Sequence, residues 1–525
     1  MKIKNPILRG FNPDPSIVKV GSDYYLATST FEWWPGIEIY HSTDLVNWNL
    51  VSEPLNNPEL CDLRGVYNSG CIWAPHLSYA NGKFWLIYTI VKSGTAFKDT
   101  LNYVITSDEI DGPWSKPIFV TASGFDPALF HDENGKHYFM SMLFDHRLDH
   151  PGFSGVVMQE FDSDEMKLVG ERRHFYEGTN LGVCEGPQIL KKDGWYYLLC
   201  AAGGTGYSHA STVARSRNVW GPYENSPFQP LISTKFDPLN GLQKSGHACF
   251  VEANEQEWYI VHICARPLTE RGYCVLGRET ALQPIIWTED GWPRLANKTT
   301  SPEVEIEAPS IFNGEQKLDN STYCDFSELE LPTYFKTLRT PLDQRGSLTE
   351  HPGYLRLYGN ESLSSLHEQT LIARRWQTFN FHSETEMTFV PTNFQQLAGL
   401  ILFYNSNNWC YLFSSYDENQ KSSYLQVEQA EAGRFSYLSE PIYLSSSTVK
   451  LAVDVDHEKG QFYYSVSNSA WQTIGWKFRA DHLSDDFIKE QGKLAFTGAM
   501  VGLCAQDFDA HQSYADFNYF SYQEK

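Results

Sequence analysis

The stretch NPDPSIVKVGSDYYL, residues 12–26, contains the pattern from which the fold can be predicted. An acid between two prolines, Asp14, precedes a short β-branched run, a polar turn follows, and a second strand begins with paired tyrosines. The same order returns in FDPALFHDENGKHYF at 125–139 and in CEGPQILKKDGWYYL at 184–198. Short apolar runs joined by turns that contain Asn-Gly or Asp-Gly indicate antiparallel hairpins.

Two further units complete the repeat when the chain is aligned on the second aromatic residue of each hairpin. These residues are Tyr25, Trp85, Tyr138, Tyr197 and Tyr259, at intervals of 53 to 62 positions. A sheet unit that recurs in this way is typical of a β-propeller, whose blades surround a central channel. We therefore predict an all-β protein that begins with a five-bladed β-propeller.

Three of the units carry an acidic residue at the start of the first strand, namely Asp14, Asp126 and Glu185. Because the first strand of each blade lines the channel, these carboxyls should converge at one mouth of it. Like charges in a confined site move their pKa values apart, so one carboxyl can hold a proton while its neighbour is ionised. For each residue taken alone, the alternative is an ordinary cap or turn residue.

The two remaining units have other residues at this position, Trp73-Ala74-Pro75-His76 in the second and Gly246-His247-Ala248 in the fifth. Acids combined with a tryptophan and a histidine are usual components of a sugar-binding pocket. A structural turn does not need that combination. We therefore predict a carbohydrate site at the mouth of the channel.

Charge and composition exclude several classes of partner. The chain of 525 residues has a net charge of −23 and no Lys/Arg cluster, whereas nucleic acids and anionic membranes require a basic surface. No run of about 18 apolar residues occurs and the N-terminal segment lacks the apolar stretch of a secretion signal, which predicts a cytoplasmic protein. Ten cysteines without CxxC spacing are expected to be reduced core thiols, so no metal site is predicted from them.

The length predicts more than one domain. The repeats occupy residues 1–300, residues 301–322 are a polar linker rich in turn formers, and residues 323–525 return to short alternating strands without the repeat. This last part predicts a β-sandwich. Within it, AGLILFYNSNNWCYLF at 398–413 is nearly continuous in apolar residues and predicts a central pair of strands.

Five motifs carry a resemblance to a known family: NPDPSIV at 12–18, FDPALF at 125–130, CEGP at 184–187, SGHA at 245–248 and LGRETALQP at 276–284. Together they resemble the β-xylosidases of glycoside hydrolase family 43, over the whole chain. The resemblance implies a five-bladed propeller followed by a concanavalin-like jelly-roll sandwich. It also implies that short β-1,4-xylooligosaccharides are hydrolysed from the non-reducing end with inversion at the anomeric carbon, and that α-L-arabinofuranosidase activity accompanies this reaction.

The resemblance assigns roles to the three acids. Asp14 matches the general base, Glu185 the general acid, and Asp126 the carboxylate that orients the acid and adjusts its pKa. An inverting hydrolysis needs a base that activates water and an acid that protonates the leaving oxygen, with their carboxyls roughly 6.5–9.5 Å apart. An ionised Asp126 is expected to raise the pKa of Glu185, so that Glu185 keeps its proton near neutral pH.

Four further residues match substrate-binding positions of the family. Arg278 matches a pocket arginine, with a salt bridge on the blade surface as the alternative. Phe31 and Trp73 fit the apolar walls that pack on the xylose ring, and ordinary blade core is the alternative for both. His247 matches a channel histidine that binds a divalent cation such as calcium in some relatives, with a hydrogen-bonded pocket residue as the alternative. No metal or other cofactor is expected to be required.

The resemblance further implies that the sandwich domain closes the pocket. In the relatives a sandwich loop reaches over the propeller, and the matching stretch is FTGAMVGLCAQD at 496–507. Met500 stands there at a position where a phenylalanine is expected, which predicts a more adaptable wall at the leaving-group subsite. We also expect a homo-oligomer, a dimer or a tetramer, whose substrate is a xylooligosaccharide.

Two other functions remain open at this point. An arabinan- or arabinose-directed hydrolase would share the three acids and differ in the shape of its pocket. A carbohydrate-binding propeller without catalysis belongs to a different class, and the presence of all three acids argues against it.

Overall fold

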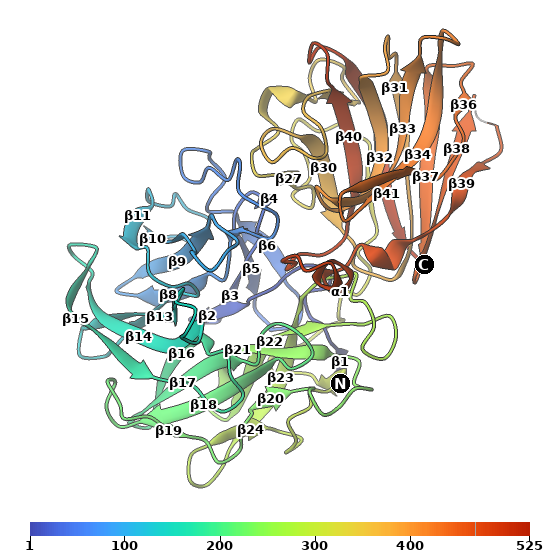
Figure 1. The fold of residues 1–525 in the computed structure, drawn as a ribbon. Helices are drawn as coiled ribbons and strands as arrows, with labels where there is room; N and C mark the ends of the chain where they lie inside the picture. Colours follow the sequence, from blue (N-terminus) through green and yellow to red (C-terminus); the bar gives the residue numbers. More distant parts are fainter. Residues whose placement is uncertain (468) are drawn as a thin grey trace.

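The computed structural model describes residues 1–467 and 469–525, which form two all-β parts (Figure 1). Five antiparallel sheets follow one another in a ring between residues 16 and 295, and two larger sheets pack on each other between residues 322 and 524. The predicted all-β fold, a five-bladed propeller followed by a β-sandwich, is confirmed.

Each blade is built from strands that are consecutive in the chain. The first blade contains β2 (Ser16–Val20), β3 (Asp23–Thr28), β5 (Glu38–Ser42) and β6 (Asn49–Ser52), and the second contains β7 (Cys71–Ile72), β8 (His76–Ala80), β9 (Lys83–Val91), β10 (Thr100–Ser107) and β11 (Ile118–Thr121). The third contains β12 (Ala128–His131), β13 (His137–Phe144), β14 (Phe153–Asp162) and β15 (Lys167–Tyr176). The fourth contains β16 (Glu185–Lys192), β17 (Trp195–Ala202), β18 (Ala210–Ser216), β19 (Glu224–Asn225) and β20 (Ile232–Ser233), and the fifth contains β21 (Gln243–Asn254), β22 (Glu257–Ala265), β23 (Glu279–Trp287) and β24 (Pro293–Leu295).

One strand of each blade lines the channel; it is the first strand in four blades and β8 in the second blade. β2 contacts β8, β8 contacts β12, β12 contacts β16, β16 contacts β21, and β21 contacts β2, which closes the ring. The aromatic residues on which the sequence was aligned all lie in the strand that pairs with the channel-lining strand of their blade, namely β3, β9, β13, β17 and β22. β1 (Lys2–Lys4) pairs with β25 (Glu305–Glu307), and Leu8 forms a β-bridge with Thr280, so the N-terminal segment is tied to the fifth blade.

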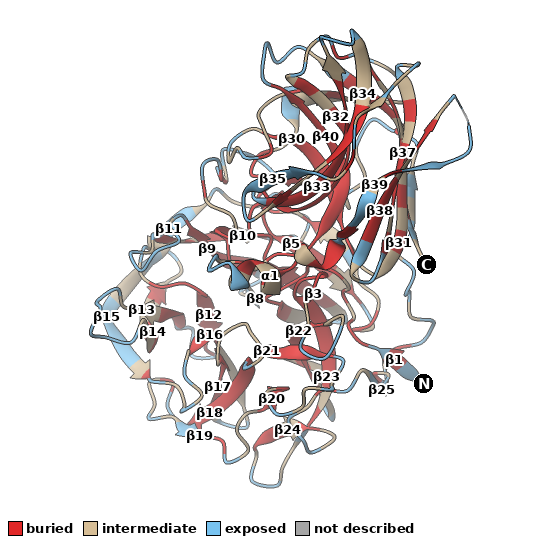
Figure 2. Cartoon of the chain, turned by 45° about the vertical axis from the view of Figure 1, so that its right-hand side comes forward, coloured by how far each residue is buried: buried red, intermediate tan, exposed pale blue. Residues whose placement is uncertain are grey.

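Apolar side chains fill the spaces between neighbouring blades. Leu26 of the first blade packs with Val261 and Leu282 of the fifth, while Leu86 of the second blade packs with Ile39 of the first. These strands are therefore buried on both faces, as the red centres of the sheets in Figure 2 illustrate. Each fully buried aliphatic side chain of this kind contributes roughly 1.5–3 kcal/mol to stability.

The sandwich consists of an eight-stranded and a seven-stranded sheet. The first contains β26 (Thr322–Cys324), β28 (Gly346–Ser347), β29 (Leu355–Tyr358), β31 (Asn380–Phe389), β37 (Thr448–Asp456), β38 (Lys459–Val466), β39 (Gln472–Arg479) and β41 (Tyr514–Glu524). The second contains β30 (Thr370–Arg375), β32 (Gln396–Asn405), β33 (Asn408–Asp417), β34 (Ser422–Glu431), β35 (Arg434–Tyr437), β36 (Ile442–Tyr443) and β40 (Met500–Asp507). Three short helical segments accompany them: η1 (Asp343–Arg345), η2 (Ala480–His482) and α1 (Asp485–Glu490).

The burial of individual strands explains how the two sheets pack. Every second residue of β31 is buried, as expected where one face of a strand meets the core and the other meets solvent. β32 and β33 pair with each other inside the seven-stranded sheet, so the predicted central strand pair is confirmed.

Backbone pairing and buried ions join the two domains. β4 (Trp33–Trp34) of the propeller pairs with β27 (Thr337–Leu338), which leads into the sandwich. The fully buried carboxylate of Glu38 lies 2.7 Å from Lys336 Nζ and also pairs with the guanidinium of Arg375. Because both cations belong to the segment after residue 322, this ion cluster crosses the domain boundary.

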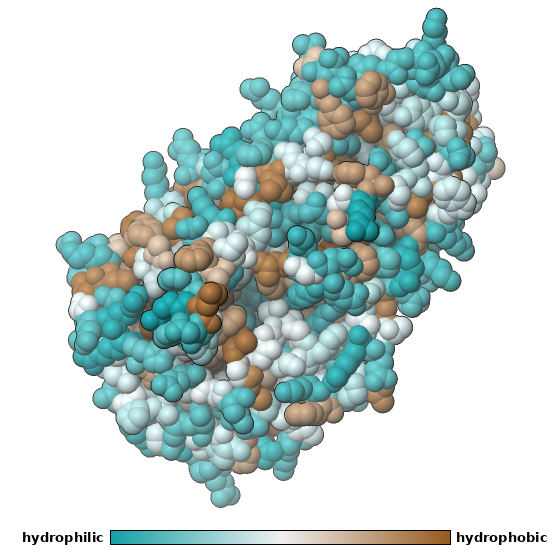
Figure 3. Space-filling view, viewed as in Figure 1, coloured by the Kyte–Doolittle hydropathy of each residue, from teal (hydrophilic) through white to brown (hydrophobic). Residues whose placement is uncertain are grey.

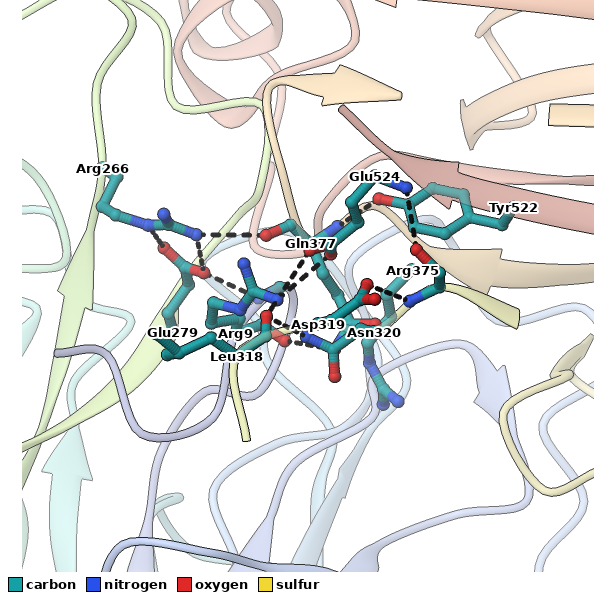
Figure 4. A network of polar contacts seen from close by, with 12 residues as sticks. Arg9, Arg266, Glu279, Leu318, Asp319, Asn320, Arg375, Gln377, Tyr522 and Glu524 are labelled. Carbon is teal, nitrogen blue, oxygen red and sulfur yellow. Dashed lines mark hydrogen bonds and ion pairs between the residues drawn. The ribbon is translucent and has the colours of Figure 1, made fainter. Parts of the chain in front are cut away.

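A second polar network connects the N-terminal segment, the fifth blade and the sandwich (Figure 4). Arg266 donates to both carboxylate oxygens of Glu279, at 2.7 and 2.8 Å, and to the carbonyl of Gln377 at 3.3 Å. Arg9 pairs with Glu524 near the end of the chain at 2.8 Å. The position of the sandwich on the propeller is therefore fixed by several charged contacts at once.

The surface is mostly hydrophilic, and apolar residues form only smaller groups on the face seen in Figure 3. Within the described residues, no helix combines the length and the apolar character that a membrane crossing requires. All ten cysteines are free, and nine of them are buried.

Candidate active site

The three acidic residues stand where the first strands of their blades begin. Asp14 comes two residues before β2, Asp126 two residues before β12, and Glu185 is the first residue of β16. Asp14 and Asp126 have left-handed backbones, with φ of 55° and 52°, so the chain turns sharply before each strand. One cavity of about 350 Å³ is lined by all seven site residues singled out in the sequence: Asp14, Phe31, Trp73, Asp126, Glu185, His247 and Arg278.

Asp14 is held by charged and neutral donors. Arg278 Nη1 donates to Oδ1 at 2.6 Å and Nη2 to Oδ2 at 3.3 Å, while Ser29 Oγ donates to Oδ2 at 2.5 Å. Burial alone would raise the pKa of Asp14, but the charges of Arg278 and His247 and the Ser29 hydrogen bond lower it below its usual value. Asp14 is therefore ionised at neutral pH. Because Arg278 is buried in this pair, the alternative of a surface salt bridge is wrong.

Glu185 has the opposite electrostatic environment. Burial, together with the negative charge of Asp14, raises the pKa of Glu185 to about 7, although Arg278 partly opposes this shift. Glu185 therefore keeps its proton up to neutral pH. The cavity thus contains one carboxyl that is ionised and another that is protonated under the same conditions, which is the arrangement that acid–base catalysis requires.

The pKa of Asp126 differs from the prediction. We expected an ionised carboxylate, whereas burial and the charges of Glu185 and Asp14 raise the pKa of Asp126 well above its usual value. The physical reason is burial, reinforced by mutual repulsion, since two buried carboxyls that share a site cannot both lose their protons easily. Asp126 and Glu185 therefore titrate as a pair. When the pair has lost one of its two protons, the two carboxyls retain the other.

Aromatic rings from both domains form one wall of the cavity. The ring of Phe496, from the sandwich, lies 5.8 Å from that of Phe31 and 5.5 Å from that of Trp73. Phe31 and Trp73 also belong to a buried cluster, so they serve the core and line the cavity together. A pentose presents C–H faces that such rings can cover.

The aromatic wall continues from Trp73 into residues that the sequence did not reveal. The ring of Phe125 packs edge-to-face on that of Trp73, with 4.9 Å between the ring centres. The rings of Phe144 and Phe153 lie 6.3 and 6.2 Å from that of Phe125. Lys98 Nζ lies 5.2 Å from the ring of Phe144, and burial lowers the pKa of Lys98. Phe125 precedes Asp126 in the FDPALF motif, which was the available signal, whereas the other three residues lie outside any motif.

His247 is a buried pocket residue. Its Nδ1 lies 3.6 Å from Asp14 Oδ1, and a Cβ added at Gly186 would come within 2.9 Å of its Nε2. Asp14, the carboxylate beside this ring, is already bound by the Arg278 guanidinium. No group of three or more metal-binding side chains is arranged for a metal ion within the described residues.

The predicted place of Met500 is wrong. Met500 is the first residue of β40, is fully buried, and pairs in the sheet with Arg375 and Phe403. Leu494 and Phe496, which precede it, line the cavity instead. The sandwich domain therefore contributes an aromatic wall, and the predicted softer wall is not present.

A confined pocket with an ionised and a protonated carboxyl on a β-propeller is the arrangement that an acid–base hydrolase of glycosidic bonds requires. The model of glycosyl hydrolases family 43 matches residues 3–293, and that of the beta-xylosidase C-terminal concanavalin A-like domain matches residues 324–523. The chain belongs to glycosyl hydrolase family 43, as the sequence motifs indicated, and its sandwich is of the concanavalin A-like type.

Known relatives resemble the chain over its full length. It is 45% identical to a beta-xylosidase of Bacillus subtilis, over 100% of both chains. It is 43% identical to a xylosidase/arabinosidase of Humicola insolens, over 99% of this chain and 98% of that one. The solved structure of a xylan beta-1,4-xylosidase from Bacillus halodurans C-125 is 45% identical and superimposes with a TM-score of 0.96, covering 99% of this chain and 100% of that one.

Proposed function

We propose that the protein is an exo-acting, inverting β-xylosidase that releases D-xylose from the non-reducing end of short β-1,4-xylooligosaccharides. The observation that carries the proposal is that Asp14, Asp126 and Glu185 line one cavity of about 350 Å³, in which the pKa of Asp14 is lowered by Arg278 and that of Glu185 is raised by burial. The full-length similarity to proteins named beta-xylosidase and xylan beta-1,4-xylosidase supports this substrate.

In the proposed reaction the ionised Asp14 accepts a proton from a water molecule. The water attacks the anomeric carbon from the face opposite the leaving group, while the protonated Glu185 donates its proton to the departing glycosidic oxygen. The bond from carbon to that oxygen breaks as the bond to water forms, which inverts the anomeric configuration. Arg278 keeps Asp14 ionised and in place through its two hydrogen bonds.

We assign to Asp126 the role of a partner that shares protons with Glu185 and orients it. The coupling between the two carboxyls supports this role, because a proton is retained by the pair near neutral pH. Phe31 and Trp73 are assigned to the sugar-binding wall, and His247 to the pocket beside Asp14. The segment that contains Leu494 and Phe496 closes one side of the cavity, which favours binding of a chain end.

Hydrolysis of xylobiose followed by NMR tests the proposal. The expected first product is α-D-xylose from the non-reducing unit, which converts to the equilibrium mixture of anomers afterwards. Initial formation of β-D-xylose from the non-reducing unit, beyond the anomeric mixture that the reducing unit already carries, would contradict inversion, and absence of turnover would contradict the activity. Asp14→Ala and Glu185→Gln variants that kept full activity would instead favour the non-catalytic sugar-binding propeller.

The second candidate is an α-L-arabinofuranosidase on the same site, with the three acids in the same roles. The relative from Humicola insolens is named xylosidase/arabinosidase, which supports this as an accompanying activity. A relative from Vibrio sp., 40% identical over 99% of both chains, is named xylan 1,3-beta-xylosidase, so the linkage also needs a direct test. Rates on 4-nitrophenyl β-D-xylopyranoside and α-L-arabinofuranoside, and on 1,3- and 1,4-linked xylobiose, rank these alternatives. A higher rate on the α-L-arabinofuranoside than on the β-D-xylopyranoside would make α-L-arabinofuranosidase the main activity.

We also propose that the protein works in the cytoplasm as a homo-oligomer, a dimer or a tetramer. Ten free cysteines support a reducing compartment, where thiols persist. Light scattering of the purified protein measures the oligomeric state, and a monomer would contradict that part of the proposal.

A further inference from the structure

The segment 494–499 is the part of the sandwich domain that enters the pocket, between α1 and β40. Within it, both backbone polar groups of Phe496 are hydrogen-bonded. Phe496 N donates to Ser69 Oγ at 3.1 Å, and Phe496 O accepts from Arg278 Nη2 at 3.2 Å. Both partners belong to the propeller, so one domain fixes an aromatic wall that the other domain supplies.

Ser69 lies in the second blade, two residues before β7, and is fully buried. Its hydroxyl accepts from Phe496, and its carbonyl accepts from Trp73 Nε1 at 3.0 Å. The rings of Trp73 and Phe496 lie 5.5 Å apart on the cavity wall. Ser69 therefore accepts a hydrogen bond from each of these two aromatic residues.

A buried carboxylate holds Ser69 in turn. Glu32 Oε2 accepts from Ser69 N at 3.0 Å, and Glu32 directly follows Phe31, the third aromatic residue of the wall. Arg339 of the sandwich donates its backbone N–H to the carbonyl of Glu32 at 2.8 Å. Because these hydrogen bonds are shielded from water, they constrain the loops that carry the three rings more firmly than exposed ones would.

We propose that Ser69 is a positioning residue of the active site, which sets the place of Phe496 relative to Trp73 and thereby the shape of the sugar-binding wall. Ser69 does not line the cavity itself, and the acid–base chemistry does not require its hydroxyl. The inference deepens the proposed function and rests on it. It applies to the binding of the sugar ring that is cleaved from the chain end.

Loss of the hydroxyl leaves the buried N–H of Phe496 without an acceptor. The segment 494–499 then shifts to reach another acceptor, and the wall no longer fits the sugar. From the usual contribution of one buried hydrogen bond, kcat/KM should fall about 3- to 10-fold. The fall should lie mainly in KM, and the acid limb of the pH profile should stay in place because Asp14 keeps its contacts with Arg278.

The test uses two substitutions that remove the same hydroxyl. The backbone of Ser69 has φ of 60°, which suits glycine and strains alanine. Ser69→Gly and Ser69→Ala should therefore differ in thermal stability but share the loss of kcat/KM on 4-nitrophenyl β-D-xylopyranoside. Ser406→Ala is the matched control, since Ser406 Oγ accepts from Asn68 Nδ2 at 2.7 Å between the same two domains, away from the cavity.

A double-mutant cycle with Phe496→Ala separates positioning from a general structural role. If Ser69 acts through the Phe496 ring, Ser69→Gly should cost activity in the wild type and almost none in the Phe496→Ala background. An equal loss in both backgrounds, or no loss in the wild type, would overturn the inference. Titration calorimetry with D-xylose gives a readout independent of turnover, in which the Kd of Ser69→Gly should rise. A wild type that binds D-xylose without hydrolysing the xyloside would contradict the proposed function, whereas an unchanged Kd in Ser69→Gly would contradict only this inference.

Discussion

Arg278 binds both carboxylate oxygens of Asp14, across 264 positions of the chain, with Nη1–Oδ1 and Nη2–Oδ2 distances of 2.6 and 3.3 Å. Both side chains are buried, so water competes little with this pair. A fully buried carboxylate without a cation would take up a proton. The ionised state of the proposed general base therefore depends on the arginine.

Arg278→Ala should raise the pKa of Asp14, because burial then acts without the opposing charge. Asp14 must be ionised to accept a proton, so the acid limb of the kcat/KM profile should move to higher pH. The loss of two charged hydrogen bonds should also lower kcat/KM by at least about 10-fold. Arg278→Lys, which keeps the charge but not the paired donors, should give an intermediate shift. An acid limb that does not move in Arg278→Ala would contradict the assignment of Asp14 as the base.

Glu185→Gln should affect substrates according to their leaving groups. The wild type should lose activity as pH rises through about 7, where Glu185 gives up its proton. For xylobiose, whose leaving oxygen must be protonated, the variant should lose about 10²- to 10⁴-fold in kcat. An aryl xyloside with an acidic phenol should lose much less. The exposed Glu171→Gln is the control, and equal losses on both substrates would rule out the proposed acid.

Glu38→Gln should destabilise the protein across its domain boundary. The substitution leaves Arg375 buried without a carboxylate and Lys336 with that of Glu53 alone, and breaking a buried ion pair in this way typically costs about 3–5 kcal/mol. Urea unfolding at neutral pH measures the loss. Glu368→Gln, which breaks an exposed pair with Arg64 between the same domains, should leave stability near the wild-type value.

The same carboxylate predicts an acid limit to stability. Burial would raise the pKa of Glu38, but Arg375 and Lys336 together lower it to about 2. A carboxyl with a lowered pKa in the folded state stabilises the fold above its ordinary value near 4.5, and this contribution disappears as pH falls towards 2. The difference in unfolding free energy between the wild type and Glu38→Gln should therefore shrink over this interval, and a constant difference would contradict the explanation.

Histidines that are partly or fully buried between the second and third blades should make the stability of the fold sensitive to milder acid. His131 Nδ1 lies 2.7 Å from His137 Nδ1, and burial lowers the pKa of His131 to about 3 and that of the adjacent His76 to about 4. The unfolded chain takes up these protons near pH 6.5, whereas the folded chain does not, so stability falls as pH drops below 6.5. His131→Asn should reduce the slope of unfolding free energy against pH between 6.5 and 4, by up to about 1.4 kcal/mol per pH unit. The exposed His511→Asn should not change it.

The repeat made the propeller predictable from the sequence. Hairpins aligned on residues such as Tyr25 and Tyr138 have strong local signals, and the circular order of their first strands places equivalent positions around one channel. For that reason Asp14, Asp126 and Glu185 could be brought together without a structure. The central strand pair of the sandwich was predictable because its apolar run is long and continuous.

Other features depend on relationships that no local pattern records. The raised pKa of Asp126 depends on its burial and on its closeness to Glu185 and Asp14, which the sequence does not record, so the ionised carboxylate expected there did not anticipate the shared protons of the pair. Met500 was placed at the pocket because the loop before β40 has no periodic pattern, and a shift of four positions separates it from Phe496. Ser69 has no motif, and its importance follows only from hydrogen bonds to residues of two domains.

The division of the cavity between two domains has an evolutionary consequence. The carboxyls belong to the propeller, whereas Leu494 and Phe496 belong to the sandwich. Mutations in the second domain can therefore accumulate without altering the apparatus that breaks the bond. Enzymes that descend from one gene can in this way diverge in the sugars that they cleave while they keep the same catalytic residues.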